Sequence, residues 1–235
     1  MNRFCNINKI GRIFLIFSFL AFQFDFIFCG SYKRFSSQKL NHFFSFSSFL
    51  EATVFQVTNT FDPITTTDPN YSGSLREAVD TSNINSQADT IFFATSVTTI
   101  FLSSTITLSE GNLLITGTKD STGINGPGVE LTATTGFTGF SITSTGNTIQ
   151  SLAFENILRP IVLNSGGGYT TILGCHFGTN LDGTATNLGN GTYGIWVNSS
   201  LAGDNVIGGD IQVTAERNVI GDYTSAAGIS FAGSS

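Results

Sequence analysis

Residues 148–177, "TIQSLAFENILRPIVLNSGGGYTTILGCHF", contain two copies of one short apolar pattern. The two copies, 23 residues apart, are Ile149, Leu152 and Phe154, and then Ile172, Cys175 and Phe177. Gly, Asn, Ser and Thr surround each copy, and these residues favour turns. Short apolar stretches between turn residues predict β-strands, so their repetition predicts strands that stack on one another.

Four more segments, "GFSIT", "PIVLN", "GIWVN" and "GISF", repeat in a second phase. Their last apolar residues follow one another at steps of 21, 34 and 34 residues, and are Ile142, Leu163, Val197 and Phe231. The two longer steps contain the loops at 178–191 and 208–217. A repeat of roughly 22 residues predicts a solenoid, whose coils bury apolar side chains only by stacking on their neighbours.

The composition agrees with a β protein. Only 11% of residues are charged, so Ser, Thr, Asn and Gly must form much of the surface. A hydrophobic fraction of 40% and a mean hydropathy of +0.19 exclude wholesale disorder. From residue 53 onward, helical spacing of apolar residues occurs in one short segment.

That segment is "SGSLREAVDTS", residues 72–82. Ser74 and Glu77 form a capping box, in which we expect Glu77 to accept from the Ser74 backbone amide. We expect a helix from about Leu75 to Ser82. Its predicted apolar face is Leu75, Ala78 and Val79, and its predicted water-facing side is Arg76, Glu77 and Asp80.

So short a helix is stable only when it packs on a core. The first coil of a solenoid exposes apolar residues and unpaired strand edges, which such a helix would cover. We therefore predict an all-β fold, a right-handed parallel β-helix (solenoid) with a short N-terminal capping helix.

Residues 73–93, "GSLREAVDTSNINSQADTIFF", resemble the CSLREA-type segment of secreted bacterial right-handed parallel β-helix proteins, with Gly73 in place of the usual cysteine. Residues 177–197 and "RNVIG" at 217–221 resemble the repeats that follow it. The resemblance covers residues 54–235 and implies an exported or cell-surface protein, with little implied chemistry. The last residues, "AGISFAGSS", lack the expected C-terminal cap, so we expect a truncated β-helix.

Residues 1–31 have the layout of a secretory signal peptide, with basic residues ahead of an apolar run at 13–22 and small residues after it. A retained N-terminal anchor and a wrongly assigned start are the alternatives. Residues 32–52 are rich in Phe and Ser and are interpreted as a low-complexity leader. The β-helix is predicted to occupy residues 53–235, and the mature domain is expected to have no membrane span.

Charge is divided unevenly along the chain. Residues 1–52 have six basic side chains and two acidic ones, whereas residues 53–235 have four basic and fourteen acidic ones. An acidic surface disfavours nucleic acid and anionic membranes as partners. Calcium or a cationic partner stays open.

Several residues are candidates for a functional site. Arg159 and Asp182, one rung apart, are expected to form a surface ion pair, although a polysaccharide lyase could use such groups. His176 follows an inward residue and is expected at the surface. Trp196 is expected to face outward, where it could stack on a sugar or be covered by the preceding loop. Residues 180–183, "NLDG", could bind calcium but are more typical of a turn.

Cys175 is expected to be a small buried residue, because Cys5 and Cys29 lie in the segment expected to be removed. The asparagines expected in left-handed corners and side-chain ladders are Asn147, Asn164 and Asn205. The asparagines in glycosylation sequons, which matter only in a host that glycosylates, are Asn70, Asn190 and Asn198.

These observations favour an exported or cell-surface structural or binding module, with an extracellular glycan or a surface protein as partner. The alternative is a β-helix carbohydrate-active enzyme, because this fold also hosts polysaccharide lyases and hydrolases. We assign no catalytic residue and no cofactor from the sequence, and calcium is the one ion considered.

Overall fold

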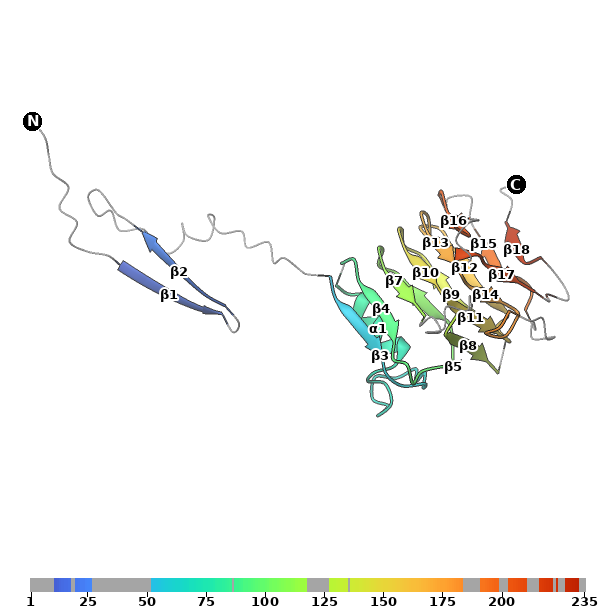
Figure 1. The fold of residues 1–235 in the computed structure, drawn as a ribbon, viewed down its shortest axis with the longest axis horizontal. Coiled ribbons are helices and arrows are strands. Elements are labelled where there is room, and N and C mark those ends of the chain that lie inside the picture. Colours follow the sequence, from blue (N-terminus) through green and yellow to red (C-terminus); the bar gives the residue numbers. More distant parts are fainter. Residues whose placement is uncertain are drawn as a thin grey trace, which may run out of the picture. The chain divides into compact units, whose positions relative to one another are not determined.

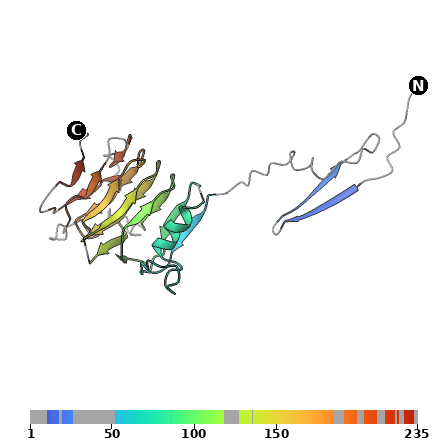
Figure 2. The same cartoon turned by 180° about the vertical axis from the view of Figure 1, so that it is seen from behind.

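A computed structural model gives the fold of the protein (Figures 1 and 2). The chain divides into two compact units, Met1–Phe49 and Leu50–Ser235, which are described separately. The structure describes residues 11–17, 20–26, 52–85, 87–117, 127–134, 136–183, 191–198, 203–210, 216–221, 223 and 227–232.

The first unit contains a two-stranded antiparallel pair. Strands β1 (Gly11–Phe17) and β2 (Leu20–Phe26) pair from Gly11 opposite Phe26 to Phe17 opposite Leu20. Both strands lie within the predicted signal peptide, which stays a prediction.

The second unit contains three sheets, in which every strand pair is parallel. The first sheet contains β3 (Val54–Val57), β4 (Thr90–Phe93), β7 (Leu114–Thr116), β10 (Thr148–Gln150), β13 (Thr171–Leu173) and β16 (Val206–Ile207). The second contains β5 (Thr99–Leu102), β8 (Val129–Ala133), β11 (Leu152–Glu155), β14 (His176–Phe177) and β17 (Val219–Ile220). The third contains β6 (Ile106–Leu108), β9 (Thr138–Ile142), β12 (Arg159–Leu163), β15 (Ile195–Val197) and β18 (Ile229–Phe231).

From β4 onward, successive strands enter the first, second and third sheet in turn, and each such set of three is one coil. Each coil therefore pairs with the next one along the axis, as the stack of arrows in Figure 1 shows. This arrangement is a parallel β-helix, so the predicted all-β solenoid is confirmed.

The strand register agrees with the repeat read from the sequence. In the first sheet, Ile149 pairs with Ile172, and in the second, Phe154 pairs with Phe177. The aligned third-sheet positions are Phe140, Ile161, Ile195 and Ile229. Inward residues of successive coils thus lie in columns, as a solenoid requires.

Aromatic rings fill the middle of the core. Phe154 and Phe177 stack with ring centroids 5.2 Å apart, and Phe140 meets Phe154 edge-on at 5.8 Å. All three side chains are fully buried. Such ring pairs stabilise a core by about 0.5–1.5 kcal/mol beyond the burial of their area.

The predicted helix is present as α1 (Leu75–Ser82). The Glu77 backbone N–H donates to Ser74 Oγ at 3.1 Å, which confirms half of the capping box. The expected return bond is wrong in its donor, because Glu77 Oε2 accepts from the Gly73 N–H at 2.6 Å. The Ser74 N–H is unavailable, since it donates to the Tyr71 carbonyl at 3.1 Å.

Helix α1 packs against β3 and β6, at the start of the solenoid. Its residues Leu75, Ala78 and Val79 are buried and belong to the continuous hydrophobic core. Among the described residues from 52 onward, no strand of the third sheet precedes β6, and the helix occupies that place.

Side chains of the helix end also satisfy the free edge of β6. Asn83 Nδ2 donates to the Thr107 carbonyl at 2.8 Å, and Asn83 Oδ1 accepts from the Ser109 N–H at 2.9 Å. These are the backbone groups that another strand would have paired. The capping role predicted for the helix therefore agrees with its packing and its hydrogen bonds.

The prediction that Arg76 faces water is wrong. Arg76 is buried and forms two hydrogen bonds with the buried carboxylate of Asp62, at 2.8 and 2.7 Å. Its guanidinium also donates to the carbonyls of Ser104 and Thr105. Helical spacing could not reveal this, because the loop that supplies Asp62 folds over the side of the helix predicted to be solvent-exposed.

The turn asparagines are placed only partly as predicted. Among the described non-glycine residues, positive φ occurs at Asn112, Ser151, Asn156 and Tyr169, so the left-handed corners predicted at Asn147, Asn164 and Asn205 are wrong. These three side chains bond to the preceding coil instead.

Asn198 Nδ2 donates to Asn164 Oδ1 at 3.0 Å, which is a ladder between coils as predicted. Asn147 Oδ1 accepts from the Leu113 N–H at 3.1 Å inside the fold, where Asn147 is fully buried. The Asn147 amide thus satisfies a backbone N–H at a corner that a strand does not reach.

Within the described ranges, α1 has eight residues, and no helix has the length and apolar character that a membrane crossing requires.

Candidate functional site

An aromatic pair lies on the outer face of the third sheet. Trp196 lies on β15 between the buried residues Ile195 and Val197, so strand alternation turns its ring outward, as predicted. Its ring stacks with that of Tyr193 at a centroid distance of 5.8 Å and an interplanar angle of 27°. Both residues are half-buried, so each keeps part of its surface in solvent.

Arg159 joins this pair from the neighbouring strand β12. Its guanidinium carbon lies 4.5 Å from the centroid of the Trp196 ring, which is a cation–π distance. Its Nε atom is buried and has no hydrogen-bond partner. We call Arg159, Tyr193 and Trp196 the aromatic platform.

The ion pair predicted between Arg159 and Asp182 is not formed. In the described part of the chain the salt bridge is that of Arg76 with Asp62. Asp182 is exposed on the turn beside His176, whereas Arg159 lies over Trp196. A spacing of one rung predicts that the two residues share a face. Asp182 lies on the loop after β14, however, so the path of that loop determines its position.

His176 is not at the surface, which corrects another expectation. Its side chain is almost fully buried, and its Nδ1 lies 3.2 Å from the Asn180 carbonyl oxygen. Burial lowers the pKa of His176 below its ordinary value, which favours the neutral ring at pH 7. The alternation in the strand does direct this residue away from the core, but residues 180–183 fold over it.

Residues 180–183 form a tight turn that packs against His176. The Gly183 N–H donates to the Asn180 carbonyl at 3.0 Å, which closes the turn. Gly183 has φ 72°, and a Cβ there would lie 3.1 Å from the His176 ring. Among the described residues, no group of three His, Cys, Asp or Glu side chains could hold a metal ion, and calcium binding at this turn stays a prediction.

Sequence reasoning missed two glutamates on the second sheet. Glu130 on β8 and Glu155 on β11 lie diagonally across paired strands, because Glu130 pairs with Ala153 and Glu155 pairs with Thr132. Their carboxyl groups are close enough for a side-chain hydrogen bond, and burial together with the charge of Glu155 raises the pKa of Glu130 to about 7. The register of "VELTA" and "LAFE" would have predicted this diagonal pair.

Glycosidases also use a pair of carboxyl groups, held at a set separation. The two carboxyl groups of such enzymes are about 5–5.5 Å apart in retaining forms and further apart in inverting forms. In this pair, burial and the charge of Glu155 favour the protonated form of Glu130. Glu155 Oε1 also accepts from Asn156 Nδ2 at 3.3 Å.

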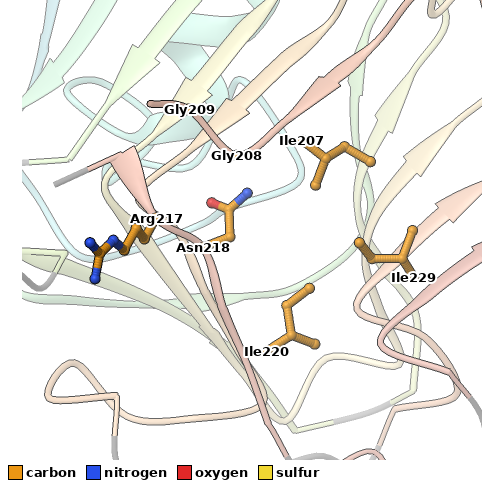
Figure 3. A pocket seen from close by; sticks show the side chains of 7 residues that line it. All are labelled: Ile207, Gly208, Gly209, Arg217, Asn218, Ile220 and Ile229. Atoms are coloured by element: carbon orange, nitrogen blue, oxygen red, sulfur yellow. The ribbon is translucent and has the colours of Figure 1, made fainter. Parts of the chain in front are cut away.

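A hollow of about 630 Å³ opens at the last coil (Figure 3). Its apolar lining is Ile207, Ile220 and Ile229, which are the inward residues of β16, β17 and β18. Their equivalents one coil earlier are fully buried, whereas these three are half-buried. The hollow is therefore the uncovered end of the hydrophobic core.

The cysteine and the sequon asparagines named from the sequence lie in different environments. Cys175 is fully buried, as predicted, and burial raises the pKa of its thiol to about 12. Asn70 and Asn198 are exposed, although the Asn198 amide is engaged with Asn164. Asn190 lies outside the described residues.

No family model, curated protein or solved structure matches this chain. The resemblance to CSLREA-type proteins thus depends on the quoted residues alone.

Proposed function

We propose that the protein is an exported or cell-surface module that binds glycans on the outer face of the third sheet. The observation that carries the proposal is the stacked pair of Tyr193 and Trp196, whose rings keep part of their surface in solvent. Aromatic rings are well suited to sugars, since a pyranose presents an apolar C–H face that packs against them.

The surroundings of the pair support this ligand class. In the outer row of the third sheet, Trp196 is flanked by Val162 on one side and Ser230 on the other, and Ser141 lies beyond Val162. Ring faces next to hydroxyl groups offer both contacts that a sugar uses, which are apolar stacking and hydrogen bonding. The signal-like segment at 1–31 and the low content of charged residues support an exported protein.

The alternative predicted with this fold is a polysaccharide lyase or hydrolase. The acidic pair of Glu130 and Glu155 lies on the second sheet, whereas the aromatic platform lies on the third. We propose binding at the platform, without turnover.

The test is a glycan array probed with the full chain, with Trp196→Ala and with Phe101→Ala. Phe101 is a matched control, because it is an exposed aromatic residue on the outer face of the second sheet, 60% accessible. We expect the parent chain and the control to bind the same glycans, and Trp196→Ala to lose at least tenfold in affinity. Binding that survives Trp196→Ala, or is absent from the parent chain, would reject the proposal.

A further inference from the structure

Resting on the proposed glycan-binding function, the geometry points to Arg159 as a specificity residue that selects a sugar bearing a carboxylate. The charge of the Arg159 side chain supports this assignment. Residues 53–235 have fourteen acidic side chains and four basic ones, so an acidic partner for each cation would be expected. Arg76 has one in Asp62, at 2.7 Å.

Arg159 has no acidic partner of this kind. Within the described residues its guanidinium makes neither a salt bridge nor a hydrogen bond, and it lies against the Trp196 ring. A half-buried cation without an anion is unfavourable, because burial removes water without replacing its charge. An anionic ligand would supply the missing charge.

The contact with Trp196 also prepares the guanidinium for such a ligand. Arginine stacks on aromatic rings through its flat face, and its N–H groups point outward from the edge in a fork that matches a carboxylate. The ring also restricts the long side chain, so less conformational entropy is lost when a ligand binds.

The same arrangement suits a uronic acid in particular. Its carboxylate is attached directly to the pyranose ring, so a sugar that stacks beside Trp196 places this group next to the guanidinium 4.5 Å above the aromatic ring. A neutral sugar could stack equally well but would leave Arg159 unpaired.

The negative charge of the protein limits how many acidic sugars in a row a bound glycan can have. With a formal net charge of −6, the chain repels a polyanion over distances of about one Debye length, roughly 10 Å at 0.1 M salt. We therefore infer a glycan with a single acidic residue as ligand, in preference to a polyuronate.

The experiment measures the affinity of the full chain for three probes by isothermal titration. The probes are an oligosaccharide with one terminal glucuronic acid, its neutral methyl ester and a polyuronate. The variants are Arg159→Gln, Arg159→Lys and Trp196→Ala, with Arg217→Gln as a matched control that removes a cation from the rim of the end hollow.

We expect the parent chain and Arg217→Gln to bind the acid at least tenfold more tightly than the ester, and more tightly than the polyuronate. Arg159→Gln should bind acid and ester equally, and Arg159→Lys should fall between, since lysine keeps the charge but lacks the fork. The comparison of acid with ester on the parent chain holds even if a variant does not fold.

Equal affinity of the parent chain for acid and ester would overturn the inference. If that shared affinity is lost in Trp196→Ala, the proposed function stands without the specificity. If no probe binds and the array is also blank, both are rejected. Tightest binding of the polyuronate would overturn the choice of a single acidic residue.

Discussion

Arg76 and Asp62 form a buried ion pair that ties the capping helix to the loop before it, through two bonds of 2.8 and 2.7 Å. Asp62 Oδ2 also accepts from the Ser103 N–H at 2.7 Å, and Arg76 reaches the carbonyl of Ser104. The loop before α1, the helix itself and the chain ahead of β6 therefore meet at one pair of charges.

Removing one member of this pair should destabilise the protein strongly. Asp62→Ala leaves a buried guanidinium without a counter-charge, and such losses cost about 3–5 kcal/mol. Urea unfolding measures the free energy of unfolding. The exposed Asp80→Ala, which loses a bond from the Tyr71 hydroxyl, should cost less than about 1 kcal/mol. Equal losses for both variants would show that the ion pair has no special role.

The cap itself is tested at Leu75, which is fully buried in the core. Leu75→Ala should lower the free energy of unfolding by about 2–5 kcal/mol, because it removes buried methyl groups and leaves a cavity. Ile84→Ala is the matched control, since Ile84 is 81% exposed and should change stability by about 0.5 kcal/mol or less. If Leu75→Asp were as soluble and as stable as the parent chain, the helix would cap nothing.

The Glu130 and Glu155 pair predicts a pH dependence of stability. The pKa of Glu130 is raised from 4.5 to about 7 in the folded state, so the folded protein holds a proton that the unfolded chain has released between these values. The contribution of Glu130 to stability is therefore complete below about pH 4.5 and is lost as the pH rises to about 7. Solvent screening limits the loss to about 1–2 kcal/mol, because Glu130 is only half-buried.

Glu130→Gln should remove this loss, so that the variant exceeds the parent chain by about 1 kcal/mol at pH 8 and matches it at pH 5. Thermal unfolding across this range measures the difference, with Glu110→Gln as the control substitution of another half-buried glutamate. The same pH profile for the parent chain and Glu130→Gln would contradict the assignment.

Cys175 should be chemically silent in the folded protein. Burial raises the pKa of its thiol to about 12, and a thiol without exposed surface neither ionises nor meets a reagent at pH 8. Peptide mass spectrometry after iodoacetamide treatment of the full chain should find Cys175 unmodified in buffer and modified in urea. Rapid native labelling would mean that the coils around Cys175 open readily.

The repeat in the sequence was sufficient to predict the architecture. Each coil must bury its own aliphatic residues on its neighbours, so the spacing of Ile149 and Ile172, or of Phe154 and Phe177, already contains the strand register. The extent of α1 could be read in the same way, from its capping box and its apolar face.

Only the tertiary structure determined the positions of side chains outside the columns of inward residues. Arg76 was expected in water and His176 at the surface, yet a loop covers each of them. The partner of Arg159 is the Trp196 ring and not Asp182. Local spacing determines which face of a strand or helix a residue occupies, but the path of a loop depends on long-range contacts, so the candidate site emerged only when the coils were stacked.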